Sequence, residues 1–228
     1  MQVIRSDLAH CGQAHGAVVV IDVLRSFTTA AVAFARGARA IVAIDSIDAL
    51  PALRARFPGA LAVGSKAGGA PAEGFDLGNS PSELDRLPLL GRTLILYTAG
   101  GVRGIAACAH ATTVLAAGLV NARATARHLL ALDPPAVTLV TTGAWTDRDG
   151  DEDTACADRI EAFLRGDEPP ADLHAARVRR SDFGRRFDAG SDPNLPRADL
   201  DCCAAVDIFD FAMPIKHSGG RLTITVAR

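Results

Sequence analysis

Charged residues follow two apolar runs of the sequence at the points where those runs end. Asp22 and Arg25 come directly after the apolar residues 17–21, and a glycine-containing turn at 98–103 follows residues 93–97. A carboxylate at such a point can bind Mg²⁺, which prefers carboxylates, water and phosphate oxygens. Arginine suits bidentate recognition of phosphate or sulfonate. The pattern predicts a small-anion site, the alternatives being that Asp22 caps the next helix and that Arg25 pairs with Asp22 alone.

A second group of polar residues lies in a long segment between apolar runs. The glycine-rich residues 64–69 contain Lys66, so that backbone amides and one positive charge could meet an anion. The spacing of a P-loop, GxxxxGK[ST], is absent. Further along, we expect Asp76 to bind a metal and Asn79 and Ser80 to bind a ligand, or else to form an Asx-turn and a helix start.

The turn at residues 98–103 joins Thr98 and two glycines to Arg103. Amide groups at the start of a helix form a ready anion site, to which Arg103 would add charge. We therefore expect Thr98 and Arg103 to contact substrate, with an exposed arginine in a tight turn as the alternative.

The acidic run at residues 147–154 is the third segment of this kind. It does not match an EF-hand, which needs glycine at loop position 6 and glutamate at position 12. Carboxylates also favour the start of a helix for electrostatic reasons alone. For Glu152 and Asp153 we expect a role in catalysis or metal binding, because they would face the same edge of the sheet as Asp22.

The elements that carry these segments repeat one order, in which an apolar strand is followed by a polar turn and a helix. The predicted strands are residues 17–21, 93–97 and 136–140, and the helices after them begin near residues 26, 102 and 153. Such alternation predicts a three-layer α/β/α fold with a mostly parallel, mixed sheet. Ligands bind beyond the carboxyl ends of such strands. The segments 22–25, 98–103 and 141–153 should therefore meet.

The remaining chain is assigned more coarsely. We expect residues 64–83 to form a long functional loop, residues 173–180 a short helix, and the segments 207–213 and 222–226 a hairpin that returns to the sheet. The chain reads as a single unit over residues 1–228, or as two merged α/β halves, about 1–90 and 91–228.

The composition of the chain indicates which classes of partner and which compartment to expect. A net charge of −2 argues against nucleic acid, which needs a basic face. No apolar run reaches the length of a membrane span, and the first residues lack the pattern of a signal peptide. The five cysteines contain no CxxC pair and no disulfide framework, which is typical of a cytoplasmic protein. We expect a homodimer that binds neither nucleic acid nor a membrane.

Four motifs taken together resemble the 2-phosphosulfolactate phosphatase (ComB) family. They are VIDVLRSFTT at 20–29, EGFDLGNSP at 73–81, EDTACA at 152–157 and the segment 199–214. The resemblance implies a compact α/β/α fold and an acid-type, Mg²⁺-dependent phosphomonoester hydrolase acting on phosphosulfolactate, a precursor of coenzyme M in some archaea. The residues at matching positions are Asp22, Arg25, Asp76, Asn79, Arg103, Glu152 and Asp153.

The primary hypothesis is therefore a Mg²⁺-assisted phosphatase for a small phosphorylated, sulfonated or carboxylated metabolite. Its metal would be held by some of Asp22, Asp76, Glu152 and Asp153, and its cations would be Arg25, Lys66 and Arg103. The rival is a binding or regulatory protein that kept the fold but lost the chemistry. It is motivated by Ser65, Gly100 and Val102, where the family usually has a glutamate, an asparagine and a threonine.

Overall fold

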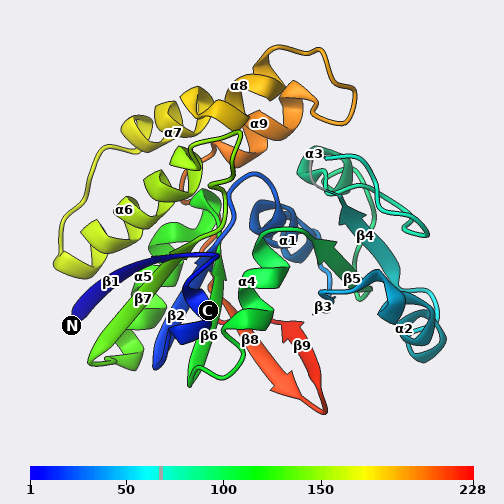
Figure 1. The fold of residues 1–228 in the computed structure, drawn as a ribbon, viewed down its shortest axis with the longest axis horizontal. Coiled ribbons are helices and arrows are strands. Elements are labelled where there is room, and N and C mark those ends of the chain that lie inside the picture. Colours follow the sequence, from blue (N-terminus) through cyan, green and yellow to red (C-terminus); the bar gives the residue numbers. More distant parts are fainter. Residues whose placement is uncertain (67–68) are drawn as a thin grey trace.

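The structure, a computed structural model, describes residues 1–66 and 69–228, and within these ranges nine strands form one sheet (Figure 1). The strand order is β1-β7-β2-β6-β8-β9-β3-β5-β4. The strands are β1 (Gln2–Asp7), β2 (Ala17–Ile21), β3 (Ala40–Ala43), β4 (Leu61–Ser65), β5 (Thr93–Thr98), β6 (Thr113–Ala117), β7 (Ala136–Thr141), β8 (Met213–Ser218) and β9 (Arg221–Ile224). The sheet is mixed and mostly parallel, which confirms the predicted fold class.

Two groups of parallel strands are joined by an antiparallel hairpin. Strands β1, β7, β2 and β6 form one parallel group, and β3, β5 and β4 form the other. Between them, β8 runs antiparallel to β6, and β9 runs antiparallel to both β8 and β3. Strands from the beginning and the middle of the chain mix within the first group, so the groups do not follow the two halves of the sequence.

Helices cover both faces of the sheet. They are α1 (Ser26–Ala35), α2 (Leu50–Arg56), α3 (Pro81–Leu84), α4 (Gly101–Ala107), α5 (Ala122–Leu132), α6 (Asp151–Arg165), α7 (Ala171–Arg180), α8 (Asp182–Asp188) and α9 (Arg197–Cys203). Short 3-10 turns lie at Cys11–Gln13, Ile47–Ala49 and Leu119–Asn121. In the part of the chain that the structure describes, no helix has both the length and the apolar character needed to cross a bilayer.

The hydrophobic core has three parts, each of which lies between helices and one face of the sheet. The largest part joins α1 and α4 to inner faces of both strand groups, through residues such as Val20, Phe27 and Leu96. A second part packs α5 and α6 against the other face of β2, β6 and β7, and a third packs α2 against β3, β4 and β5. Helices α1 and α4 therefore lie between the two groups of strands, as Figure 1 shows.

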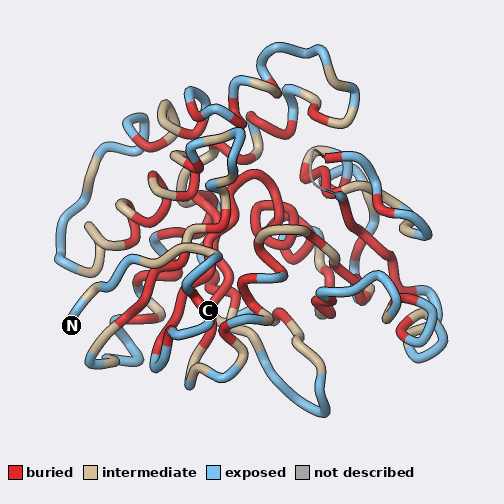
Figure 2. Tube along the Cα trace, viewed as in Figure 1, coloured by how far each residue is buried: buried red, intermediate tan, exposed pale blue. Residues whose placement is uncertain are grey.

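Helix α1 is buried on every side, and its start fixes the position of residues that line the site. All residues from Ser26 to Phe34 are buried, as the red segment after β2 in Figure 2 shows. Alanine, threonine and phenylalanine fill this space without placing a charge in the core. The predicted helix is confirmed. Because it begins directly after β2, the residues 22–25 are fixed between buried elements.

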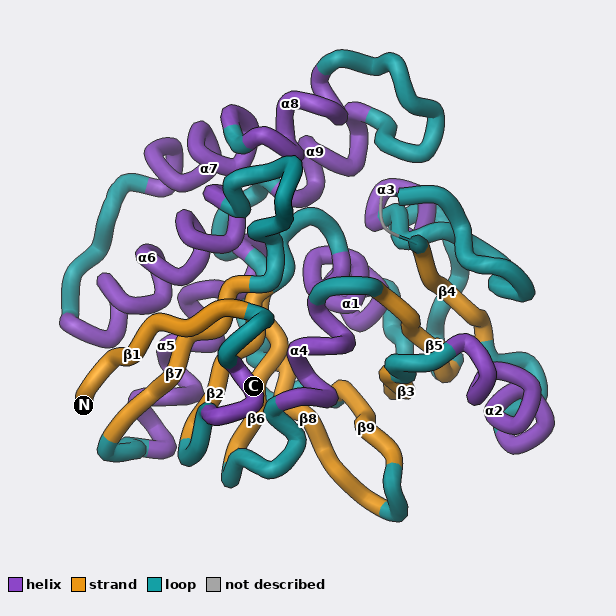
Figure 3. Tube along the Cα trace, in the orientation of Figure 1, coloured by secondary structure: helices purple, strands orange, loops and turns teal. Residues whose placement is uncertain are grey.

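Several boundaries differ from those expected from the sequence (Figure 3). The hairpin strand expected at residues 207–213 instead begins at Met213, and residues 208–211 form loop. Part of the expected loop 64–83 belongs to β4 and α3. The strand Gln2–Asp7 and the helices α8 and α9 carry no strong periodic pattern, and the sequence did not indicate them.

Candidate active site

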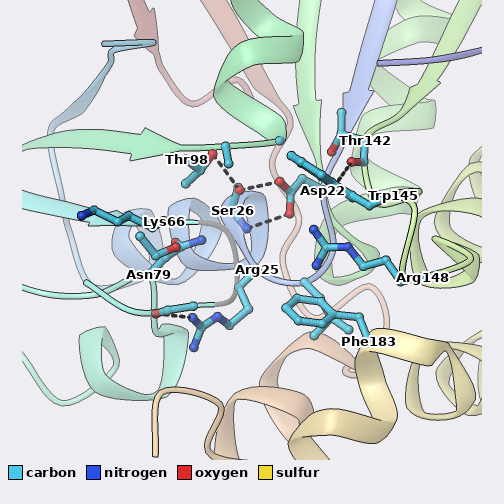
Figure 4. A pocket seen from close by; sticks show the side chains of 16 residues that line it. Asp22, Arg25, Ser26, Lys66, Asn79, Thr98, Thr142, Trp145, Arg148 and Phe183 are labelled. Atoms are coloured by element: carbon cyan, nitrogen blue, oxygen red, sulfur yellow. Dashed lines mark hydrogen bonds between the residues drawn. The ribbon is translucent and has the colours of Figure 1, made fainter. Parts of the chain in front are cut away.

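A pocket opens where strands β2, β4, β5 and β7 end (Figure 4). It holds about 460 Å³ of empty space, including the part open to solvent. The lining residues are Asp22, Leu24, Arg25, Ser26, Ser65, Lys66, Gly69, Asn79, Thr98, Ala99, Gly100, Thr142, Gly143, Trp145, Arg148 and Phe183. The expectation that the segments after the first, second and third predicted strands meet is therefore confirmed.

Asp22 is the carboxylate of this pocket, and its oxygens are held by three donors. Its Oδ1 accepts a hydrogen bond from the Ser26 amide (3.0 Å), and its Oδ2 accepts one each from the Ser26 hydroxyl (2.5 Å) and the Gly101 amide (2.8 Å). A Cβ at position 101 would lie 2.9 Å from Oδ2, so only glycine allows this approach without displacing the carboxylate. Asp22 thus both caps α1, the alternative considered from the sequence, and faces the pocket.

Asp153 and Glu152 lie behind the pocket wall at the start of α6, and both are 1 % exposed. Asp153 accepts hydrogen bonds from the backbone amides of Val23 (2.8 Å) and Thr142 (2.9 Å), which tie the turns after β2 and β7 to α6. Glu152 Oε2 finds no hydrogen-bond partner in the described part of the chain. A Cβ at Gly143 would lie 2.7 Å from Glu152 Oε1, so this glycine lets the carboxyl reach the pocket lining.

The burial of these two carboxyls changes their proton affinity. Loss of hydration raises the pKa of Glu152 to about 7, against the opposing influence of Ser181 and the Arg148 charge. Loss of hydration, followed by repulsion from Asp22 and Glu152, raises the pKa of Asp153 well above its ordinary value. Groups that change protonation near neutral pH are frequent in active sites.

Hydrogen-bond donors and one lysine form the facing wall. Thr98 Oγ1 lies 3.0 Å from Ser26 Oγ and accepts a hydrogen bond from the Val102 amide (3.2 Å), so it joins α1 to α4. Figure 4 shows Lys66 and Asn79 on the side of the pocket away from Arg148. Asn79 is 3 % exposed, and its Oδ1 has no partner among the residues that the structure describes.

Arg25 lines the pocket, whereas Ser80 lines an adjoining hollow, and both side chains contact Asp199, a residue that sequence reasoning did not select. Arg25 Nη1 donates to Asp199 Oδ2 (2.5 Å), and both side chains are almost fully buried. Asp199 Oδ1 accepts from the hydroxyls of Ser80 (2.7 Å) and Ser82 (2.6 Å). Asp199 therefore connects the turn after β2 to the start of α3. Arg25 lines the pocket as a neutralised cation, and its partner is Asp199 rather than Asp22, the pairing considered as an alternative from the sequence.

Two predicted site residues lie elsewhere. Asp76 pairs with Arg54 (2.8 Å) and accepts from the Ala62 amide (2.7 Å), at the outer side of β4. Arg103 is exposed and lines a separate hollow beside Asp45 and Leu8. Neither is among the residues described as lining the pocket. The expectation that they join it is corrected, because the loop turns Asp76 back toward β4 and the third residue of α4 faces away from α1.

Three lining residues were missed by sequence reasoning. Trp145, Arg148 and Phe183 form the wall opposite Lys66, and the Arg148 guanidinium points toward Asp22 in Figure 4. Trp145 and Arg148 belong to the turn after the third predicted strand, but the prediction for that turn selected only its carboxylates, Glu152 and Asp153. Phe183 lies in α8, a helix that no periodic pattern in the sequence indicates.

The four carboxylates expected to form a metal centre do not converge. Within residues 1–66 and 69–228, no group of three or more His, Cys, Asp or Glu side chains has an arrangement able to hold an ion. Asp76 lies outside the pocket, and the oxygens of Asp153 already accept hydrogen bonds from two backbone amides. Asp22 alone lines the pocket and keeps one oxygen, Oδ1, with a single hydrogen bond. The described side chains thus offer the pocket one carboxylate, and any further ligands of an ion bound there would have to be water or substrate phosphate.

Comparison with known proteins places the chain in a family. A model of the family described as 2-phosphosulpholactate phosphatase matches residues 3–218. Proteins named probable 2-phosphosulfolactate phosphatase from Synechocystis sp. and Bacillus subtilis are 36% and 30% identical, over 221 and 209 residues, each alignment covering 90% of both chains. One of that name from Carboxydothermus hydrogenoformans is 44% identical over 117 residues, 51% of this chain and 48% of the relative. The chain therefore belongs to the 2-phosphosulfolactate phosphatase family.

Proposed function

We propose that the protein is a phosphatase that hydrolyses a small anionic phosphomonoester, as the names of its relatives indicate for them. One observation carries this proposal: a single pocket places the Asp22 carboxylate among positively charged groups and hydrogen-bond donors from the ends of four strands. Phosphoryl transfer needs mainly positioning and offset of negative charge, rather than covalent chemistry by the protein. A small polar pocket of this composition suits that requirement.

Residues on one side of the pocket would bind the substrate, and residues on the other side would orient water and exchange a proton. Lys66, Asn79 and the lining turn 98–100 would bind phosphoryl oxygens and the second anionic group of the substrate. Asp22 is rigidly held by Ser26 and Gly101, so it can orient an attacking water without moving. Glu152, with a pKa near 7, is suited to exchange a proton with the site at neutral pH.

A magnesium ion is part of the proposal. Asp22 would be its protein ligand, and when bound the ion would offset charge on the phosphoryl group and lower the pKa of bound water. Glu152 Oε2, which lacks a partner in the described chain, is a further oxygen near the site. Asp153 is less suited, because two amide donors already occupy its oxygens.

The test is release of inorganic phosphate from phosphosulfolactate, phosphoglycolate and a neutral aryl phosphate by the purified protein. We expect turnover of the anionic esters, loss of turnover with EDTA and its return with Mg²⁺. Asp22→Asn should lower kcat by at least about 100-fold, because it removes the carboxylate that orients the attacking water and would bind magnesium. Asp76→Asn, which changes a carboxylate outside the pocket, is the matched control. Turnover that survives Asp22→Asn would contradict the proposal.

A non-catalytic binding protein remains the second candidate, on one observation. Ser65 and Gly100 line the pocket with a hydroxyl and a hydrogen, where the family usually places larger polar side chains. Binding of phosphate or sulfolactate by calorimetry, with no turnover of any ester at any Mg²⁺ concentration, would favour this candidate.

A further inference from the structure

Arg148 is a cation of the pocket wall held between two aromatic rings. Its guanidinium carbon lies 4.3 Å from the centre of the Phe183 ring and 5.1 Å from that of Trp145. Stacking of this kind restrains an arginine side chain while leaving the edge of the guanidinium free for hydrogen bonds. In Figure 4 that group points into the pocket toward Asp22.

Arg148 forms no ion pair with a carboxylate in the described part of the chain, although its charge lies near enough to act on Glu152. Its Nε is buried and has no hydrogen-bond partner there, and no ion pair forms between its guanidinium and a described residue. Its neighbours differ, because Arg186 pairs with Asp147 (2.9 Å) and Arg25 pairs with Asp199 (2.5 Å). A partly buried guanidinium without an acceptor is costly unless a ligand supplies one.

The backbone around Arg148 is fixed to α8. The Asp149 amide donates to Asp182 Oδ2 and the Asp182 amide donates to Asp149 Oδ1, both at 3.2 Å. The Trp145 indole donates to the Thr142 carbonyl (3.2 Å), which anchors the ring to the end of β7. This double attachment keeps Arg148, Trp145 and Phe183 in one wall before any ligand enters.

We infer that Arg148 binds the phosphoryl group of the ligand, and that Trp145 and Phe183 are positioning residues that aim it. The inference rests on the proposed function for its substrate class. Neither the sequence motifs nor the names of the relatives assign a role to this arginine. Arg25, the arginine expected from the sequence to do this, is already paired. Arg148 meets the anion from the side opposite Lys66, so the two charges enclose it.

The chain carries its own reporter for a test that needs no turnover. Trp145 is the single tryptophan of the sequence and stacks on Arg148, so binding of inorganic phosphate should change its fluorescence. Phosphate is titrated into the wild type and into Arg148→Gln, Arg148→Lys and Phe183→Leu, with calorimetry as a second readout. The control is Arg165→Gln, which removes an exposed arginine at the far end of α6. Thermal melting shows that each variant is folded.

We expect Arg148→Gln to weaken phosphate binding roughly 10- to 100-fold, the value of one charged hydrogen-bonding group. Arg148→Lys should lie between it and the wild type, and Phe183→Leu should cost about two- to fivefold. Arg165→Gln should match the wild type. Phosphate binding that depends on Arg148 without hydrolysis of any ester would support this inference and refute the proposed phosphatase. Hydrolysis with the same KM and the same phosphate inhibition in Arg148→Gln would overturn the inference alone.

If Arg148→Gln fails to fold, Arg148→Lys and Phe183→Leu decide the matter. Folded variants of both that bind phosphate as tightly as the wild type would overturn the inference. A wild-type protein that binds no phosphate by either readout would also overturn it.

Discussion

Replacement of Glu152 by glutamine tests the electrostatics behind the pocket. Burial raises the pKa of this carboxyl from its ordinary value of 4.5 to about 7. The folded state then holds a proton that the unfolded chain has released between these two values, so folding stability falls as the pH rises through this window. The loss should reach about 3 kcal/mol above pH 7, since each unit of pKa corresponds to about 1.4 kcal/mol.

Glutamine cannot ionise, so Glu152→Gln should remove this loss. We expect the melting temperature of the variant relative to wild type to rise between pH 5 and pH 8.5 by about 6–12 °C, given about 2–4 °C per kcal/mol for a chain of this size. The measurement is calorimetric melting across this range. Glu73→Gln, which removes an exposed carboxylate, is the control and should follow the wild-type profile. A constant difference between variant and wild type at all pH values would refute the reasoning.

Three further predictions concern single residues. Asp199→Ala leaves the buried Arg25 without a carboxylate partner and should lower the free energy of unfolding by about 3–5 kcal/mol, measured by urea titration. Asp201→Ala breaks an exposed ion pair on the same helix and should cost under about 1 kcal/mol in the same titration. Equal losses would show that the buried pair is not special. Arg103→Gln should leave phosphate affinity unchanged, because Arg103 lines another hollow; weaker phosphate binding in a titration would contradict the geometry. Burial lowers the pKa of His174, so the contribution of this residue to stability should fall as the pH drops below 6.5, opposite in sign to that of Glu152. The melting temperature of His174→Phe relative to the wild type should therefore rise as the pH falls from 7 to 5, and a constant difference over this range would exclude the effect.

The strand-and-turn order was sufficient to predict the fold class and the meeting of three chain segments. Parallel strands place their carboxyl ends on one edge, so Asp22 and the turn at 98–100 came together as expected. The position of β8 and β9 could not be read in the same way. Their residues alternate weakly, and their place between β6 and β3 depends on pairing with strands distant in sequence.

The site was harder to predict than the fold, because residue type does not tell which partner a side chain will take. Asp76 and Arg103 have suitable chemistry, but each faces a neighbour outside the pocket. Arg25 lines the pocket, but its charge is paired with Asp199, which is 174 residues away in sequence. Arg148 is the opposite case. The role proposed for it depends on its having no ion-pair partner in the described chain, and no pattern in the sequence indicates this.

The hairpin β8–β9 has a consequence for how the protein is made. Its strands come late in the chain, yet they occupy the middle of the sheet between β6 and β3. While a ribosome is still translating residues 213–224, the edges of β6 and β3 have no partner, and such edges favour aggregation. A chain that lacks residues 213–224 therefore has nothing to join its two groups of parallel strands.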